Sequence, residues 1–231
     1  MAVLKSLILA AAAMSTSALA LGDRIQAREV TLSYGIPQTG TGEELSFSEA
    51  DLPTLRFVTI GRGVQNYTCA SPSDAPVQKG PAAGAVAQLF DATAEVANNQ
   101  PLVDAVTNVA VGNPRPDLAA DALASLFPLN GQFAPVAHHF FTADGVPTFD
   151  FGERGLLSGA KLENVPAPDD AAASPNGAAA VDWLLIDAVE PSNQFSKVAR
   201  IVTAGGKPPA SCEGQESVIA VDYAAQYWFW A

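Results

Sequence analysis

The side chains best suited to chemistry in this sequence are its two histidines, which are adjacent at His138 and His139. Neighbouring residues of a strand point to opposite faces, so a single metal ion cannot easily take both imidazoles as ligands. A serine hydrolase would need one of them beside a nucleophilic serine, and the chain lacks the G-x-S-x-G turn that often presents such a serine. We therefore predict neither a metal site nor a bound cofactor, and the residues do not favour serine hydrolysis.

Acidic side chains follow the histidines closely, at Asp144, Asp150 and Glu153. Glycosidases use two carboxyl groups that flank the scissile bond. Asp150 and Glu153 are the candidates for such a pair here. The simpler interpretation places these acids on a solvated hairpin and its turn. Both interpretations stay open, because spacing along the chain does not say which carboxyl groups meet in space.

A further group of polar residues predicts a ligand-binding face. Gln65 and Tyr67 are two apart on an expected strand, so their side chains project to the same side. His139 lies on another expected strand, and Asp150 follows it. If the two strands pair, these four groups converge beside aromatic rings, as in a sugar-binding cleft. The other interpretation makes Tyr67 a core residue and His139 a buried, hydrogen-bonded histidine, with Asp150 facing solvent.

The first twenty residues have the features of a secretory signal peptide. One lysine, Lys5, precedes an apolar run over residues 7–14, and small residues lead to Ala18-Leu19-Ala20, an A-x-A-type cleavage site. A helix that spans a membrane needs about 20 apolar residues, so this run is too short. We predict a secreted, extracellular protein with no membrane span.

Export places the two cysteines, Cys69 and Cys212, in an oxidising compartment. An even number of cysteines there favours one disulfide, which would join an early to a late part of the chain. Asn66-Tyr67-Thr68 is an N-x-[ST] sequon. It predicts glycosylation of Asn66 if the exporting cell is eukaryotic.

The elements that must position these residues are mostly strands. After an N-terminal arm over residues 21–54, apolar and polar residues alternate over 55–69, with a bulge or bend expected at Gly61-Arg62-Gly63. Further strands are expected over 133–151, as a hairpin with its turn at Asp144-Gly145, and over 181–189, 197–203 and 217–230. Residues 85–91 fit a strand or a helix.

One part of the chain has helical spacing instead. Apolar residues recur every three or four positions over 101–111 and 117–127, so we expect a helical excursion around 101–127. The last strand is apolar on both faces, which is typical of a strand between two layers. We predict a single all-β domain over 55–231, a β-sandwich or barrel with a short helical insertion.

Charge and composition narrow the partners. The 231 residues include 12 Lys and Arg against 24 Asp and Glu, which gives a formal net charge of −12. Nucleic acid is bound through clustered basic residues, so we expect no nucleic-acid partner. Hydrophobic residues make up 48% of the chain, enough to build a packed core.

Three segments of the chain resemble a known family. They are residues 56–69, with the motif Gln-Asn-Tyr-Thr-Cys, residues 181–184, and the Tyr- and Trp-rich end at 223–229. Together they resemble a family of exported proteins of filamentous fungi and bacteria that is catalogued as a domain of unknown function. The resemblance implies export and a β-rich domain, and it implies no activity.

Some fungal members of that family carry the label malate dehydrogenase, which the sequence does not support. A dinucleotide fold needs G-x-G-x-x-G between a strand and a helix. Here Gly61 and Gly63 are followed by Asn66 where the third glycine belongs, and by strand-like residues where the helix belongs. We predict that the protein is not an NAD-dependent dehydrogenase.

Two functions from different classes follow from these observations. The first is a secreted acidic protein without catalytic activity that acts at the cell surface or outside the cell, by binding polysaccharide or a host or cell-wall component. The alternative is a carboxylate-dependent extracellular hydrolase acting on carbohydrate. A flat aromatic surface would favour the first function, and two carboxyl groups about 5 to 10 Å apart in a concave site would favour the second.

Overall fold

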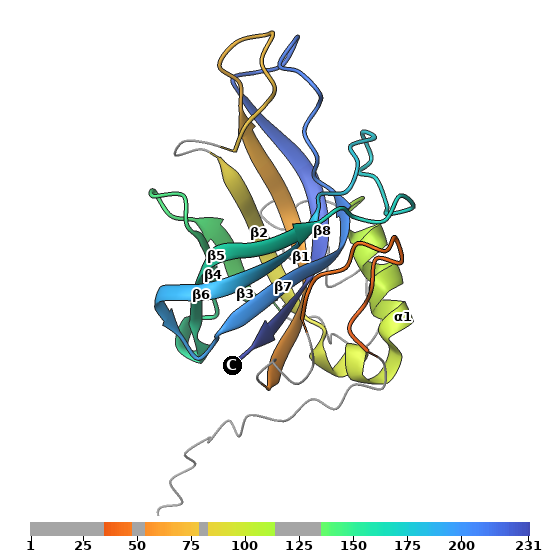
Figure 1. Cartoon of the computed structure of the whole chain (residues 1–231), viewed down its shortest axis with the longest axis vertical. Coiled ribbons are helices and arrows are strands. Elements are labelled where there is room, and N and C mark those ends of the chain that lie inside the picture. Colours follow the sequence, from red (N-terminus) through yellow and green to blue (C-terminus); the bar gives the residue numbers. More distant parts are fainter. Residues whose placement is uncertain (1–34, 48–53, 79–82, 114–134) are drawn as a thin grey trace, which may run out of the picture.

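The structure is a computed structural model that describes residues 35–47, 54–78, 83–113 and 135–231 (Figure 1). The expected signal peptide over residues 1–20, much of the expected arm over 21–54 and the second helical stretch over 117–127 lie outside the described residues.

Eight antiparallel strands close into a barrel in which each strand pairs with its neighbours in the chain and the last strand pairs with the first. The prediction of an all-β domain is confirmed, with the barrel rather than the sandwich as its form. The strands are β1 Leu55–Thr68, β2 Gly84–Asp91, β3 Pro135–Phe141, β4 Pro147–Asp150, β5 Leu156–Val165, β6 Trp183–Asn193, β7 Lys197–Gly205 and β8 Val218–Trp230.

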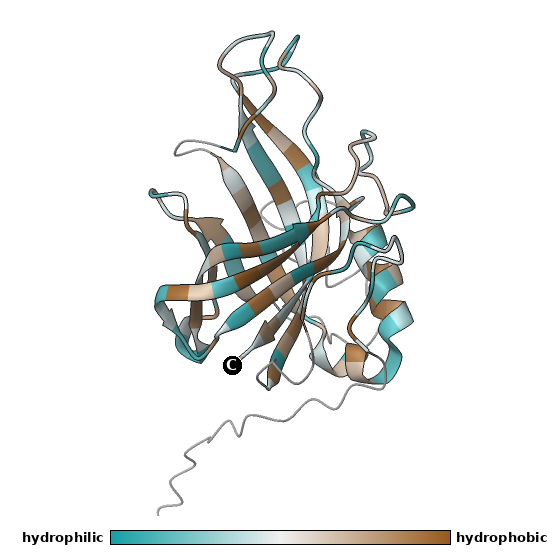
Figure 2. Ribbon diagram, in the orientation of Figure 1, coloured by the Kyte–Doolittle hydropathy of each residue, from teal (hydrophilic) through white to brown (hydrophobic). Residues whose placement is uncertain are grey.

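Alternation along the strands divides the apolar residues between two cores, and β8 contributes to both (Figure 2). Tyr227 and Phe229 belong to the cluster inside the barrel, together with Phe149 of β4. Trp228 and Trp230 belong to the cluster on the outer side. The last strand is therefore buried on both faces, as its sequence predicts. Its aromatic rings form core and not an exposed platform.

The outer core is covered by the helix α1, Thr93–Ala110, which packs against β1, β7 and β8 (Figure 1). The sequence places the start of this helix at Pro101, and the structure places it eight residues earlier, at Thr93. Asn99 has non-helical angles (φ −156°, ψ 74°) and Pro101 follows it inside the helix. Proline removes a backbone donor and clashes with the preceding turn, which explains the kink and the misplaced start.

The glycines of β1 do not form the bend that the sequence predicts. Gly61, Arg62 and Gly63 pair in unbroken register with Ala225, Ala224 and Tyr223 of β8, and the register shift of this pair lies at Leu55–Phe57 instead. A Cβ on Gly63 would lie 1.9 Å from the carbonyl oxygen of Val86. These glycines therefore permit close packing inside a continuous strand.

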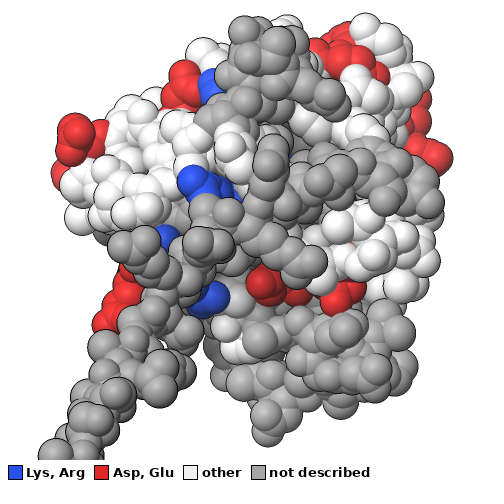
Figure 3. All heavy atoms as spheres, turned by 90° about the horizontal axis from the view of Figure 1, so that it is seen from below, with Lys and Arg blue, Asp and Glu red and all other residues white. Residues whose placement is uncertain are grey.

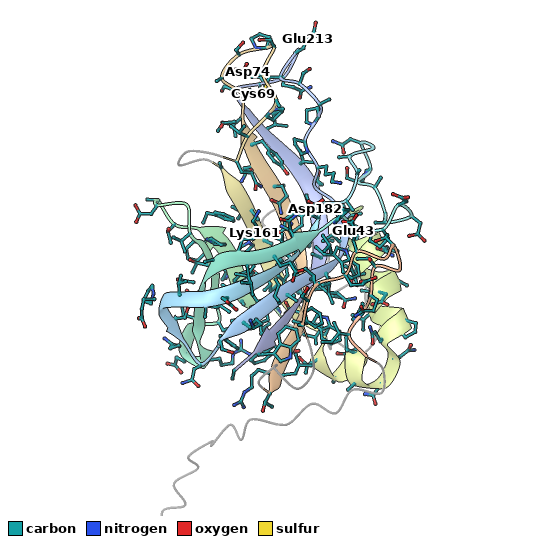
Figure 4. All side chains as sticks on the ribbon, in the orientation of Figure 1. Glu43, Cys69, Asp74, Lys161, Asp182 and Glu213 are labelled. Carbon is teal, nitrogen blue, oxygen red and sulfur yellow. A yellow bond between two sulfur atoms is a disulfide. The ribbon has the colours of Figure 1, made fainter. Side chains whose placement is uncertain are left out.

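One end of β1 and one end of β8 reach beyond the other strands, at the top of Figure 1. There the sulfur atoms of Cys69 and Cys212 lie 2.07 Å apart and the Cα atoms 5.6 Å apart, as the sequence predicts (Figure 4). The backbone N–H of Cys212 donates to the carbonyl oxygen of Asp74, which also ties the loop after β1 to the segment before β8.

Charged groups of both signs lie on the face of the molecule seen from below, with acidic groups both at its margin and near its middle (Figure 3). Within the described residues, no helix has the length and apolar character that crossing a membrane requires.

Candidate functional site

A cavity of about 380 Å³ lies inside the barrel, between β3, β4, β5, β6, β7 and β8. Its volume is within the range of small-molecule sites. The turn between β3 and β4 and the side chain of Gln78 contribute to its rim. Most of its lining is aromatic or aliphatic, from His139, Phe141, Phe149, Leu184, Ile186 and Tyr227.

The floor of the cavity is built from three buried rings. The rings of His139 and Phe149, which face each other across β3 and β4, are stacked with their centroids 4.0 Å apart. Tyr227 packs against both, at 5.7 Å from His139 and 5.2 Å from Phe149. The rim is more open, since Lys161 is exposed and Val146 and Pro147 are partly exposed. The cavity thus runs from an exposed rim to a buried aromatic floor.

His139 is held as a neutral ring. Its Nδ1 lies 2.8 Å from the carbonyl oxygen of Thr148, which can only accept, so Nδ1 carries the hydrogen and Nε2 does not. Burial lowers the pKa of His139 to about 4, although the bond to Thr148 opposes this and the charge of Arg200 adds to it. The imidazole is therefore uncharged at neutral pH.

The tyrosines inside the barrel are also neutral. The hydroxyl groups of Tyr223 and Tyr227 are hydrogen-bonded at 3.0 Å, and burial raises the pKa of each. The Tyr67 hydroxyl donates to the carbonyl oxygen of Gly206 at 2.8 Å, and burial raises its pKa to about 12. These rings offer hydrogen bonds without charge.

Two cations line the cavity, Arg200 and Lys161. Arg200 Nη2 donates to the main-chain oxygen of Asp182 at 2.8 Å, while its buried Nε has no hydrogen-bond partner among the described residues. Lys161 Nζ donates to Asn164 Oδ1 at 3.3 Å (Figure 4). Neither Asp nor Glu occurs among the described residues that line the cavity. The site is therefore mainly apolar with a positive charge in its wall.

The structure brings three of the four predicted ligand-face residues into the barrel. His139 lines the cavity. Gln65 and Tyr67 are buried on the same side of β1, and Gln65 Oε1 accepts a hydrogen bond of 2.6 Å from Gln78 at the rim. Asp150 does not join them, because it is exposed on the opposite side of the barrel wall.

The position of Asp150 follows from the register of the hairpin. His139 pairs with Phe149, so their inward side chains leave His138 and Asp150 paired on the outer face. There Asp150 Oδ1 accepts a hydrogen bond from Gly152 N at 2.7 Å, beside an outer hollow of about 370 Å³. The predicted convergence of Asp150 with His139 is therefore wrong.

The same outer hollow bears on the alternative function. Asp150 is the acid among its described lining residues, and Glu153 is exposed nearby in the short 3₁₀ helix Gly152–Arg154 without lining it. Glu153 lines neither of the two hollows described, so neither of them is flanked by both candidate carboxyl groups.

Sequence reasoning missed Arg200, Tyr227 and Phe149 as site residues. Arg200 lies in a short strand whose Val198 and Ile201 are fully buried, and an arginine among such neighbours is the signal that would have singled it out. Tyr227 and Phe149 were expected in strands, and only the closure of the barrel shows that they face a cavity.

The glycine pair tested against a dinucleotide site lies in the middle of β1, which is paired on both sides. Every pair of named strands among the described residues is antiparallel. A Rossmann fold is built from parallel strands joined by helices. The described architecture therefore agrees with the prediction that no phosphate-binding turn forms at Gly61.

Comparison with known proteins places this barrel in a family. A search of curated proteins and a search of solved structures both find no match. A family model described as "Protein of unknown function (DUF3455)" matches residues 50–231, which include the whole barrel and its helix. The chain belongs to this family of proteins of unknown function.

Proposed function

We propose that this protein is a non-catalytic binder of small molecules that holds one ligand inside its barrel. The observation that carries the proposal is the cavity of about 380 Å³ with a buried floor of His139, Phe149 and Tyr227. An eight-stranded barrel has an interior that is either filled by side chains or able to hold one small ligand. Here part of it is open.

The chemistry of the lining supports binding. The tyrosine hydroxyls are hydrogen-bonded to each other, and His139 is bonded to the backbone through Nδ1. These rings are held in fixed positions by packing, which lowers the entropic cost of ordering a site around a ligand. An apolar cavity with a few placed polar groups is the usual composition of a ligand pocket.

The size of the cavity narrows the expected ligand. A polysaccharide chain is bound along an open groove or a platform of exposed rings, whereas the Tyr- and Trp-rich end of β8 is buried. The proposal therefore replaces polysaccharide with a small molecule as the preferred ligand. Such a molecule would come from the surroundings or from the cell wall.

We also propose that the protein acts outside the cell. The disulfide between Cys69 and Cys212 is compatible with an oxidising compartment, and residues 1–20 have the pattern of a signal peptide. Asn66 lies between the inward residues Gln65 and Tyr67, so its side chain is on the outer face of β1. Its glycosylation stays a prediction.

A screen of small molecules by thermal shift and calorimetry tests the binding function. Leu184 lines the cavity and is partly buried, so Leu184→Trp would fill the space. Leu162 is 56% exposed on the neighbouring strand, so Leu162→Trp makes the same change outside the cavity. We expect ligands of the unaltered protein to bind Leu162→Trp normally and to bind Leu184→Trp at least about tenfold more weakly.

A second variant covers the case in which Leu184→Trp does not fold. Val146 is partly exposed at the rim, and Val146→Trp would obstruct the entrance without changing the buried floor. Equal affinity of a ligand for the unaltered protein and for a folded, filled variant would contradict binding in the barrel.

A further inference from the structure

We propose that the ligand is a small carboxylic acid with an apolar body, and that Arg200 binds its carboxylate. This inference rests on the proposed function, because it names the ligand class for the same cavity.

The charge of the cavity is opposite to that of the chain. The formal net charge is −12, with twice as many acidic as basic residues. Yet the charged side chains among the described lining residues are Arg200 and Lys161, both cationic. In a chain of this composition, a wall with two cations and no acid is selective for anions. An anionic ligand would be repelled by most of the surface and attracted here.

Arg200 has hydrogen-bonding capacity that the described residues leave unused. Nη2 donates to the main-chain oxygen of Asp182 and the guanidinium also hydrogen-bonds the Tyr227 hydroxyl, but Nε is buried without a partner among those residues. The Asp182 carboxylate forms an ion pair with Lys207 at 3.5 Å, and no ion pair of Arg200 occurs within the described residues. A charged donor left unpaired in a protein wall is unfavourable, and a carboxylate matches the fork of a guanidinium.

The other groups around Arg200 do not compete for an anion and do not neutralise Arg200. His139 and Tyr227 are neutral, and Phe141, Phe149, Leu184 and Ile186 are apolar. The rest of the ligand would therefore lie against rings and aliphatic side chains. The lining therefore suits a ligand that has one negatively charged end and an apolar body.

The test uses matched pairs of compounds, namely benzoate, phenylacetate and cinnamate with their uncharged amides. Each pair has the same body and differs in the charge of one end. We expect at least one acid to bind by calorimetry, and its amide to bind about 10- to 100-fold more weakly, because a hydrogen bond to a charged group is lost. This comparison uses the unaltered protein and needs no variant.

Variants of the arginine then locate the effect. Arg200→Gln should remove the preference for the acid over the amide, and Arg200→Lys should keep part of it, because lysine retains the charge but not the fork. Arg56→Gln removes a cation on β1 that does not line the cavity, so it should leave the preference unchanged.

The outcomes separate this inference from the proposed function. If acids and amides bind equally and Leu184→Trp weakens both, the carboxylate inference is overturned while binding in the barrel stands. If an acid binds equally to Leu184→Trp, the site lies elsewhere and both are overturned. If none of the acids binds at millimolar concentration, the carboxylate inference is overturned, and the broader screen decides the proposed function.

Discussion

The ring of His139 lies parallel to the ring of Phe149, with an angle of 5° between their planes, and both side chains are buried inside the barrel. A charged imidazole would lose its solvation there and would gain no carboxylate partner among the residues that line the cavity. The pairing therefore makes the stability of the fold depend on His139 remaining neutral.

This dependence predicts acid sensitivity. The ordinary pKa of 6.5 applies to unfolded His139 and a pKa of about 4 to the folded state, so the unfolded chain binds the proton more tightly. The contribution of neutral His139 to the free energy of unfolding is then fully present above pH 6.5. It is lost as the pH drops toward 4, which lowers the free energy of unfolding by up to about 3 kcal/mol. Urea unfolding between pH 7.5 and 4 measures this slope. In His139→Phe this contribution should disappear.

The neighbouring histidine is the matched control for that experiment. His138 is exposed on the outer face of β3, so His138→Phe should keep the acid slope of the unaltered protein. An equal slope in His139→Phe and in the unaltered protein would show that another group is responsible.

A second prediction concerns Gln226, which joins β8 to α1. Gln226 Nε2 donates to Asp104 Oδ1 at 2.7 Å, and Gln226 Oε1 accepts from Trp228 Nε1 at 3.0 Å. Gln226→Leu leaves the buried indole N–H and a half-buried carboxylate without this partner, so we expect a loss of about 2 to 4 kcal/mol in the free energy of unfolding.

A double-variant cycle with Asp104, the partner of Gln226, measures the interaction between the two side chains. Burial raises the pKa of Asp104, and its bond with Gln226 opposes that shift. Asp104→Leu combined with Gln226→Leu should therefore cost less than the sum of the single changes. Additive losses in the double-variant cycle would mean that the two residues do not interact. Gln215→Leu, at an exposed position, should change stability little.

A third prediction concerns the glycines that the sequence assigned to a bend. Gly63→Ala would place a methyl group 1.9 Å from the Val86 carbonyl oxygen, so β1 and β2 would have to separate. We expect a loss of about 3 kcal/mol or a failure to fold. Gly35→Ala meets no atom within 4 Å and should leave the melting temperature unchanged. A stable Gly63→Ala protein would argue against the close packing described for β1.

A fourth prediction concerns the cross-link. Peptide mapping without reduction should find one linked pair that contains Cys69 and Cys212, which are 143 residues apart. The chain-entropy model gives about 5 kcal/mol for a loop of this size, as an upper value. Replacing both cysteines with serine should lower the free energy of unfolding by about 3 to 5 kcal/mol. Two thiols that react with an alkylating agent in the native, unreduced protein would contradict the pairing.

Strands with regular patterns were predictable from the sequence. The hairpin turn at Asp144-Gly145 separates β3 from β4 as expected, and the two-faced apolar pattern of residues 217–230 matches a strand between two cores. Strand β5 was not expected. A register shift between Lys161 and Glu163 interrupts its alternation, and its middle carries exposed residues. Period-two reasoning fails where a bulge changes the side to which residues point.

The candidate site was predictable only in part, for a related reason. Parity along one strand put Gln65 and Tyr67 on the same side, and the structure agrees. The alternation in one strand does not determine which residues of the next strand point inward, because that depends on the turn that joins the two strands. The register after β3 therefore puts Asp150 outside while His139 lies inside. Arg200 stands out as an arginine in an otherwise buried strand, but the sequence does not show that it faces a cavity, because that follows from the closure of the eight strands.

The pairing of β1 with β8 also has a kinetic consequence. The first and last strands of the barrel meet along their whole length, from Leu55 with Trp230 to Thr68 with Val218. Contacts so distant in sequence form slowly, on the scale of milliseconds to seconds in β proteins. Cys69 and Cys212 lie just beyond the end of this ladder, so their sulfur atoms come within bonding distance once β1 and β8 have paired. The rate at which the disulfide forms during refolding should therefore report the rate at which the barrel closes.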